Sequence, residues 1–175
     1  MKLLLLVSVL ILSINSLNAQ NKKGVSVADT LAAMPDYSPI KSLSPEEYAS
    51  YQNGDEMGMA RPAELNNYPS PAIALALAKE LKLNDLQRAQ LQAAEQALDF
   101  KAKEMGRFIL QHEKKLNDLF STGKANEGSV IYYCNQIGLY HGELRNAHLQ
   151  AHLKARRILT AEQLKKISRV KRETN

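Results

Sequence analysis

Residues 144–164, LRNAHLQAHLKARRILTAEQL, contain the pattern that decides the fold. Apolar residues recur at three- and four-residue intervals as far as Ile158, and this spacing predicts a helix. Thr160 and Gln163 then have the spacing of a capping box, in which each side chain bonds the backbone amide of the other residue. We therefore expect one helix to end near Ile158 and a new helix to begin at Thr160.

A looser copy of this pattern lies upstream at residues 83–87, LNDLQ. Asn84 replaces the threonine but keeps the capping chemistry, and Gln87 can return to the cap amide. A long helix is expected from Asn84 to about Ser121, where Gly123 supplies a left-handed cap. The sequence therefore predicts two similar helical corners.

Two further helices complete the expected fold. One runs from Asn126 to about Ile158, and a short one precedes the first corner at residues 71–82. Long helices of about 38 and 33 residues, joined by a loop of about four, must run antiparallel. The pattern thus predicts an all-α domain over residues 71–172, built on a long helical hairpin with short flanking helices. The apolar face of the short helix is expected to contain Ile73, Leu77 and Leu81.

The helix expected at residues 126–158 carries two apolar lines. The first has an apolar residue every seven positions from Val130, with a further residue four positions after each. Cys134 belongs to this line, and we expect it to be a packed thiol; the alternative is a disulfide between two subunits. The second line lies opposite much of the first, and the short helices cannot cover all of it. Either a second subunit packs there or the line stays open as a binding surface. This second line consists of Tyr132, Leu139, Leu149 and Leu153.

The N-terminal part has a different character. Lys2, an apolar run at residues 3–14 and the small Ala19 predict a cleavable export signal over residues 1–19, which places the mature chain in a bacterial periplasm. Residues 20–70 contain too many prolines and glycines for long elements and are expected to form a largely irregular arm. One short helix is expected at Ser44-Pro45-Glu46-Glu47, where serine caps and glutamate closes a capping box.

Charge separates these parts. Residues 20–70 carry four basic and seven acidic side chains, whereas residues 71–175 carry eighteen basic and eleven acidic ones. Export makes nucleic acid an improbable partner for this basic part. Anionic polypeptide segments or an anionic membrane surface fit better, and a solvated helix face is the alternative.

The two corners resemble the paired LTxxQ motifs of the Spy/CpxP family of small periplasmic stress proteins. The match is carried by residues 83–87 and 159–163, with Asn84 as its one departure. Residues 54–71 (GDEMGMARPAELNNYPSP) and 148–153 (HLQAHL) resemble a subgroup described as refolding chaperones or periplasmic heavy-metal sensors. The motif residues are Leu83, Asn84, Gln87, Leu159, Thr160 and Gln163.

This resemblance implies a four-helix cradle that dimerises and binds unfolded or aggregation-prone envelope proteins under stress, without ATP. The residue pattern agrees, because apolar side chains interleaved with mobile charge suit varied clients. We expect no nucleic-acid partner; docking to an envelope sensor protein through the basic end is an alternative role. The expected client-binding residues are Tyr132, Leu139, Arg145, Leu149, Leu153, Lys154, Arg156 and Arg157.

His148 and His152 are one helical turn apart and could hold Zn²⁺ or Cu²⁺, although a stable site needs further ligands. Asp99 or Glu95 of the facing helix could supply a carboxylate. The simpler interpretation places His148 near the first apolar line as a hydrogen-bonding core group, with His152 at the edge of that line. A pH-sensitive contact is a third interpretation. A metal-binding stress-response or sensor accessory protein is therefore the alternative function, and otherwise no cofactor is expected.

The sequence gives no support for an enzyme. It contains no GxSxG elbow, HExxH pair, glycine-rich phosphate loop or CxxC pair. Cys134 and His141 lie two turns apart on one helix, which is too far for activation of a nucleophile.

Overall fold

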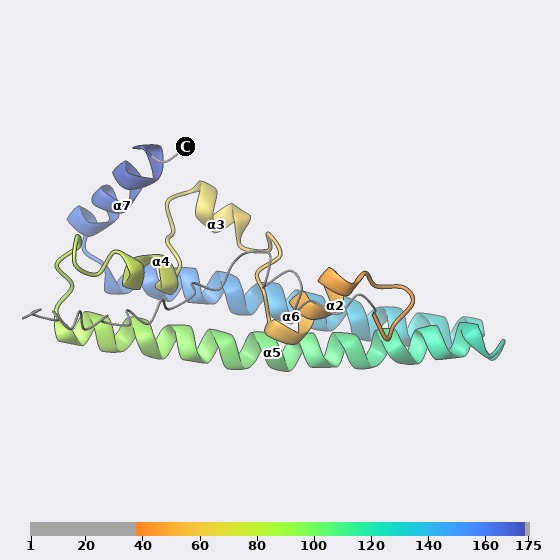
Figure 1. The fold of residues 1–175 in the computed structure, drawn as a ribbon. Helices are drawn as coiled ribbons and strands as arrows, with labels where there is room; N and C mark the ends of the chain where they lie inside the picture. The colour runs from red at the N-terminus through yellow and green to blue at the C-terminus, as the bar shows by residue number, and fades with distance from the viewer. Residues whose placement is uncertain (1–37, 174–175) are drawn as a thin grey trace, which may run out of the picture. The chain divides into compact units, whose positions relative to one another are not determined.

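The computed structural model describes residues 38–173, and the predicted export signal lies outside these residues (Figure 1). All regular structure in the described range is helical, which confirms the all-α prediction. None of these helices combines the length and apolar character needed to cross a lipid bilayer. The helices are α2 (Pro45–Asn53), α3 (Arg61–Leu65), α4 (Pro71–Ala76), α5 (Asp85–Ser121), α6 (Glu127–Ile158) and α7 (Ala161–Glu173).

The predicted helix starts are confirmed by their capping bonds. Asn84 Oδ1 accepts from the Gln87 amide at 2.8 Å, and Gln87 Oε1 accepts from the Asn84 amide at 3.3 Å. The Thr160 and Gln163 side chains form the same reciprocal pair at 3.2 and 2.9 Å. Ser44 closes the predicted capping box of α2 with Glu47. Local hydrogen bonding therefore sets these boundaries.

Helices α5 and α6 lie side by side and form the body of the described structure (Figure 1). They contain 37 and 32 residues. Residues 122–126 connect them, and Gly123 has the left-handed φ of 68° expected at the end of α5. Because the connection is this short, the two helices run in opposite directions. We call them the α5–α6 pair.

The two corners meet at the end of the α5–α6 pair that is farther from this connection. Gln87 Nε2 donates to Gln163 Oε1 at 2.9 Å and to the Ile158 carbonyl at 3.0 Å. Gln163 Nε2 donates in turn to Gln87 Oε1 at 3.2 Å and to the Leu81 carbonyl at 3.1 Å. Each glutamine thus caps its own helix and donates a hydrogen bond to a backbone carbonyl that precedes the other motif. The same two side chains also bond each other, so each corner is held by the other.

An apolar cluster lies around these glutamines and joins α4, α5, α6 and α7. Leu83 and Leu159, the first residues of the two motifs, are both buried in it, and so is Ile167 of α7. Burial of such side chains contributes about 1.5–3 kcal/mol each. The cluster therefore holds α4 and α7 against the base of the α5–α6 pair. Its buried members are Ala74, Ala78, Leu81, Leu83, Leu91, Ala155, Leu159 and Ile167.

The helix predicted at residues 71–82 is shorter than expected. Helix α4 ends at Ala76, and hydrogen-bonded turns continue to Lys82, which has a φ of 51°. These turns redirect the chain so that Leu81 and Leu83 both enter the cluster. The predicted face is also wrong in part, because Ile73 is exposed whereas Ala74 and Ala78 are buried.

We predict that replacing Gln163 by alanine lowers the free energy of unfolding by about 1–3 kcal/mol, because it removes a cap and leaves partly buried polar groups unpaired. Urea unfolding followed by far-UV circular dichroism measures this change. Gln150→Ala is the control, since Gln150 is exposed on α6 and its side chain donates to Asn146 Oδ1 of its own helix at 3.4 Å. The double variant Gln87→Ala/Gln163→Ala should lose less than the two single losses combined. Strict additivity contradicts the coupling of the two corners.

Candidate functional site

Large apolar side chains are exposed on both helices of the α5–α6 pair. On α6, Tyr132 and Leu139 of the predicted second line are each 54% exposed. On α5, the sequence analysis missed Phe100, which is 72% exposed, and Phe120. The members of this exposed apolar set on the pair are Leu86, Phe100, Phe120, Ile131, Tyr132 and Leu139.

The other predicted client-binding residues have mixed environments. Leu149 and Leu153 are half-buried, so the second apolar line is less exposed toward the C-terminal end of α6. Arg156 differs from the prediction, because its guanidinium lies 4.3 Å from the centre of the Tyr68 ring and donates to the Asn67 carbonyl at 3.0 Å. It therefore holds the segment before α4 instead of standing free. The exposed cations of the predicted set are Arg145, Lys154 and Arg157.

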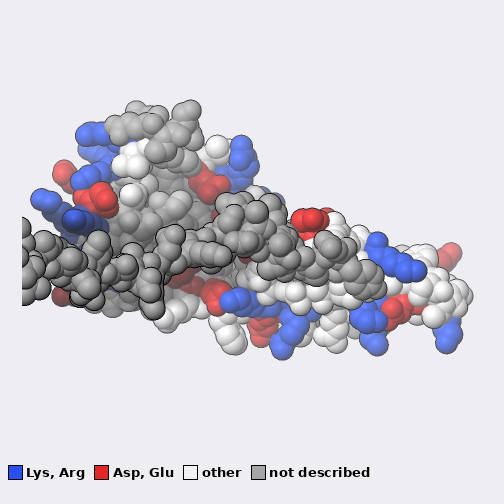
Figure 2. Space-filling model, in the orientation of Figure 1, with Lys and Arg blue, Asp and Glu red and all other residues white. Residues whose placement is uncertain are grey.

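Charged side chains accompany the apolar set. Figure 2 shows basic and acidic residues alternating along the visible side of α5, and Lys and Arg side chains gathered around α7. Several are paired within α5: Lys103 with Asp99 at 2.6 Å, and Lys114 with Asp118 at 2.7 Å. The hydrogen bond from Lys114 lowers the pKa of Asp118. Exposed pairs of this kind add little stability and can rearrange around a bound polypeptide.

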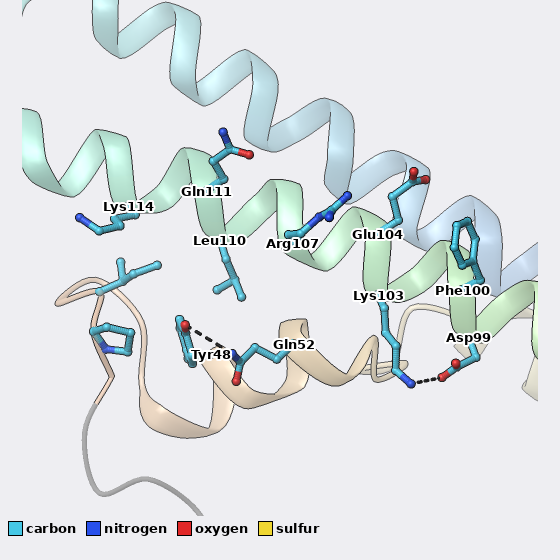
Figure 3. A pocket seen from close by; sticks show the side chains of 12 residues that line it. Tyr48, Gln52, Asp99, Phe100, Lys103, Glu104, Arg107, Leu110, Gln111 and Lys114 are labelled. Atoms are coloured by element: carbon cyan, nitrogen blue, oxygen red, sulfur yellow. Dashed lines mark hydrogen bonds and ion pairs between the residues drawn. The ribbon is translucent and has the colours of Figure 1, made fainter.

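A groove of about 790 Å³ lies between α2 and α5 (Figure 3). Tyr48 and Gln52 of α2 face Leu110 of α5 across it, and the Lys103–Asp99 pair lies toward one end. Its walls combine apolar, aromatic and charged groups without a convergent set of polar atoms, which suits a polypeptide segment better than a small polar ligand. The lining residues are Pro39, Ile40, Tyr48, Gln52, Asp99, Phe100, Lys103, Glu104, Arg107, Leu110, Gln111 and Lys114.

Residues 38–70, which we call the arm segment, pack on the α5–α6 pair. Tyr51 of α2 is buried in a second apolar cluster with Ala102, Met105 and Ile109 of α5 and Leu144 of α6. The segment is therefore part of the folded body, although most of residues 20–70 was expected to be irregular.

Three histidines of α6 contact the arm segment. His152 Nδ1 donates to the Tyr68 carbonyl at 2.7 Å. The Gly54 backbone lies near His148 and acts to raise the pKa of this histidine. His141 Nε2 lies 3.2 Å from the Tyr51 hydroxyl, within hydrogen-bonding distance. These side chains fasten the arm segment along α6.

Burial lowers the pKa of two of these histidines and so favours their neutral form. Desolvation lowers the pKa of His148 from its ordinary value of 6.5, although Glu56 and Asp55 of the arm segment oppose the shift. Its Nε2 is buried and has no hydrogen-bond partner in the described part of the chain, so a proton there would be unsatisfied. Burial likewise lowers the pKa of His141, against the opposing charge of Glu113.

The described residues do not support the metal hypothesis. His148 and His152 are 5% and 1% exposed, and His152 is hydrogen-bonded to the arm segment. Of the two expected carboxylates, Asp99 is paired with Lys103, whereas Glu95 Oε2 is buried without a hydrogen-bond partner among the described residues. Within residues 38–173 no group of three His, Cys, Asp or Glu side chains is placed to hold a metal ion. Their burial and contacts agree better with the interpretation of the two histidines as core groups.

Cys134 is exposed, so the prediction of a packed thiol is wrong. Burial along α6 begins only at Leu144, because the arm segment and short helices cover the other end of the pair. Phe100 and Phe120 could not be singled out from spacing, because the sequence does not show which side of α5 the neighbouring elements cover. The position of the arm segment had one signal in the sequence, Gly106. A glycine inside a long helix often marks a place where another backbone approaches closely.

Comparison of the chain with models of protein families, with curated proteins and with solved structures found no match.

We predict that the folded chain loses stability as the pH falls below about 6.5, because unfolded His148 takes up a proton that the folded form resists. The contribution is fully present above pH 6.5 and is lost as the pH falls through the lowered folded pKa. Thermal unfolding between about pH 7.5 and pH 5.5 measures it. His148→Gln should flatten part of this dependence, with His141 causing the remainder.

His112→Gln is the matched control for this prediction. His112 lies on α5, and its Nδ1 donates to the Phe108 carbonyl of its own helix at 2.7 Å. This variant should keep the pH dependence of the original chain. An unchanged dependence in His148→Gln contradicts the assignment.

Proposed function

We propose that this chain is an ATP-independent, chaperone-like protein that binds unfolded or aggregation-prone polypeptides on the exposed surfaces of the α5–α6 pair. The observation that carries the proposal is the exposed apolar set on this pair, with aromatic and aliphatic side chains between mobile charges. Exposed apolar surface of this kind marks binding sites for other macromolecules.

The chemistry of this surface suits varied clients. Unfolded chains expose core side chains, and burying these against Phe100, Phe120 or Leu139 is favourable without any specific sequence. The surrounding Lys and Arg side chains speed encounters with acidic segments, and their long stems can cover apolar surface when no client is bound. No nucleotide is needed, because binding itself keeps clients apart.

We place this activity in the bacterial periplasm and in the Spy/CpxP type of stress protein. The support is the export signal predicted at residues 1–19 and the two LTxxQ-like corners, whose glutamines bond each other. In this proposal the α5–α6 pair is the hairpin of a cradle, and two copies combine their apolar faces into one client-binding surface.

The direct test is an aggregation assay with a reduced or thermally stressed model protein, without nucleotide. Near-stoichiometric amounts of the mature chain should suppress light scattering. Sedimentation of the same sample should give a dimer. If aggregation proceeds unchanged at several-fold excess of the chain, the proposal is wrong.

We predict that Ile131→Gln/Leu139→Gln weakens client binding by about 3- to 10-fold, since each exposed side chain can bury apolar area on contact with a client. The folded chain should keep its thermal stability, because both residues are exposed. Asn135→Gln, on the same side of α6 but polar already, is the control and should bind clients normally. Equal affinity in the double variant and the control contradicts a role for this part of α6.

A further inference from the structure

The arm segment occupies part of the surface that the proposed function uses. Tyr51 of α2 fills an apolar strip made by Ala102, Met105 and Ile109 of α5 and Leu144 of α6. This strip lies along the same two helices as the exposed apolar set. The chain therefore covers one stretch of its apolar surface with its own residues and leaves the neighbouring stretch open.

The contact depends on a very close approach between backbones. A Cβ placed on Gly106 of α5 would lie 1.9 Å from the Tyr51 carbonyl oxygen, a distance that forces the two apart. A Cβ on Gly54 would lie 2.8 Å from Ala102 Cβ and from the Lys103 backbone nitrogen. Two glycines thus let the arm segment seat at a single position on α5.

The attachment is firm at Ile40, Tyr51 and Ala60, which are buried, but slight elsewhere in the segment. Helix α3 has no buried residue, and Met57 and Leu65 are exposed. Ser42 reaches Glu113 of α5 only through an exposed hydrogen bond of 3.3 Å. Beside α2 the groove of about 790 Å³ stays open (Figure 3). Segments with few buried contacts open at a small free-energy cost.

The composition of the arm segment indicates what else the strip can bind. Residues 38–70 contain two basic and five acidic side chains, whereas residues 145–175 contain nine basic and two acidic ones. The segment thus offers a tyrosine on an acidic, glycine-containing chain to an apolar strip of a body whose basic excess lies toward its C-terminal end. Unfolded acidic polypeptides with exposed aromatic side chains offer the same chemistry.

We propose that the arm segment is an internal competitor, which covers the Ala102–Leu144 strip at rest and is displaced by an acidic, aromatic-bearing unfolded client. Displacement adds the strip to the open surface, so the client-binding area grows when a client is present. The displaceable attachment stands without the proposed function, whereas the competition with clients rests on it.

Gly106→Ala tests the proposal on the full mature chain. The added methyl clashes with the Tyr51 carbonyl, while alanine favours the α5 helix itself. Gly138→Ala is the matched control, because it makes the same change inside α6 where nothing lies within 4 Å of the added Cβ. Tyr51→Ala removes the side chain that packs on the strip and does not alter α5.

Three measurements separate the possible outcomes. In Gly106→Ala and Tyr51→Ala, amide hydrogen exchange in α2 should accelerate about tenfold while the α5–α6 pair stays protected. Binding of an apolar-surface dye should rise, and less chain should suffice to suppress aggregation of an acidic client. Gly138→Ala should match the original chain in all three.

Unchanged α2 exchange and dye binding in both variants overturn the displaceable attachment. Faster exchange and more dye without a gain in suppression overturn the competition, provided that the original chain suppresses aggregation. Absence of suppression in every chain, with faster exchange still present, overturns the proposed function and the competition but leaves the displaceable attachment standing.

Discussion

The reciprocal hydrogen bonds between Gln87 and Gln163 are the constraint on which the rest of the structure depends. Each side chain satisfies the first amide of its own helix and a carbonyl that precedes the other motif. The bonds therefore fix where α5 and α7 begin and also how α5 is aligned against the end of α6. With this alignment set, the three histidines of α6 lie where the arm segment can reach them. A displacement by one helical turn would separate His152 from the Tyr68 carbonyl and Tyr51 from its strip.

Burial and exposure are divided between the two ends of the α5–α6 pair. At the base, four helices share one apolar cluster, and the arm segment covers the neighbouring strip. Toward the connecting residues the two helices have only each other, and their outer apolar side chains remain in water. The molecule gains its stability at one end, so the other end can carry an apolar surface that a self-contained helical domain would bury. This division is what makes a binding role physically reasonable.

The sequence was sufficient for everything that local hydrogen bonding decides. Asn84, Thr160 and Ser44 could be assigned as caps because each capping box is complete within four residues. Contacts between distant residues could not be derived in this way. The Gln87–Gln163 bond joins residues 76 apart, and spacing alone gave each glutamine only its local role.

The errors about exposure have the same origin. Cys134 continues an apolar spacing, yet nothing in that spacing says where the covering elements stop. The apolar face that includes Ile73 was predicted for a helix that continues to residue 82. Helix α4 ends at Ala76 and turns follow, so the predicted face does not apply and Ile73 is exposed. The arm segment could be recognised as proline-rich, but its seat on Gly106 depends on a partner carbonyl that no local pattern encodes.

Full burial in α5 ends at Ile109 and in α6 begins only at Leu144, which has a mechanical consequence. Beyond these residues the two helices are joined by half-covered rings, such as His112 beside Tyr133 with ring centroids 6.0 Å apart. Unzipping this distal stretch costs far less than global unfolding, because little fully enclosed apolar area is lost. Residues 122–126 still join the two helices at this end, so the distal stretch can loosen and repack its half-covered side chains without the helices separating.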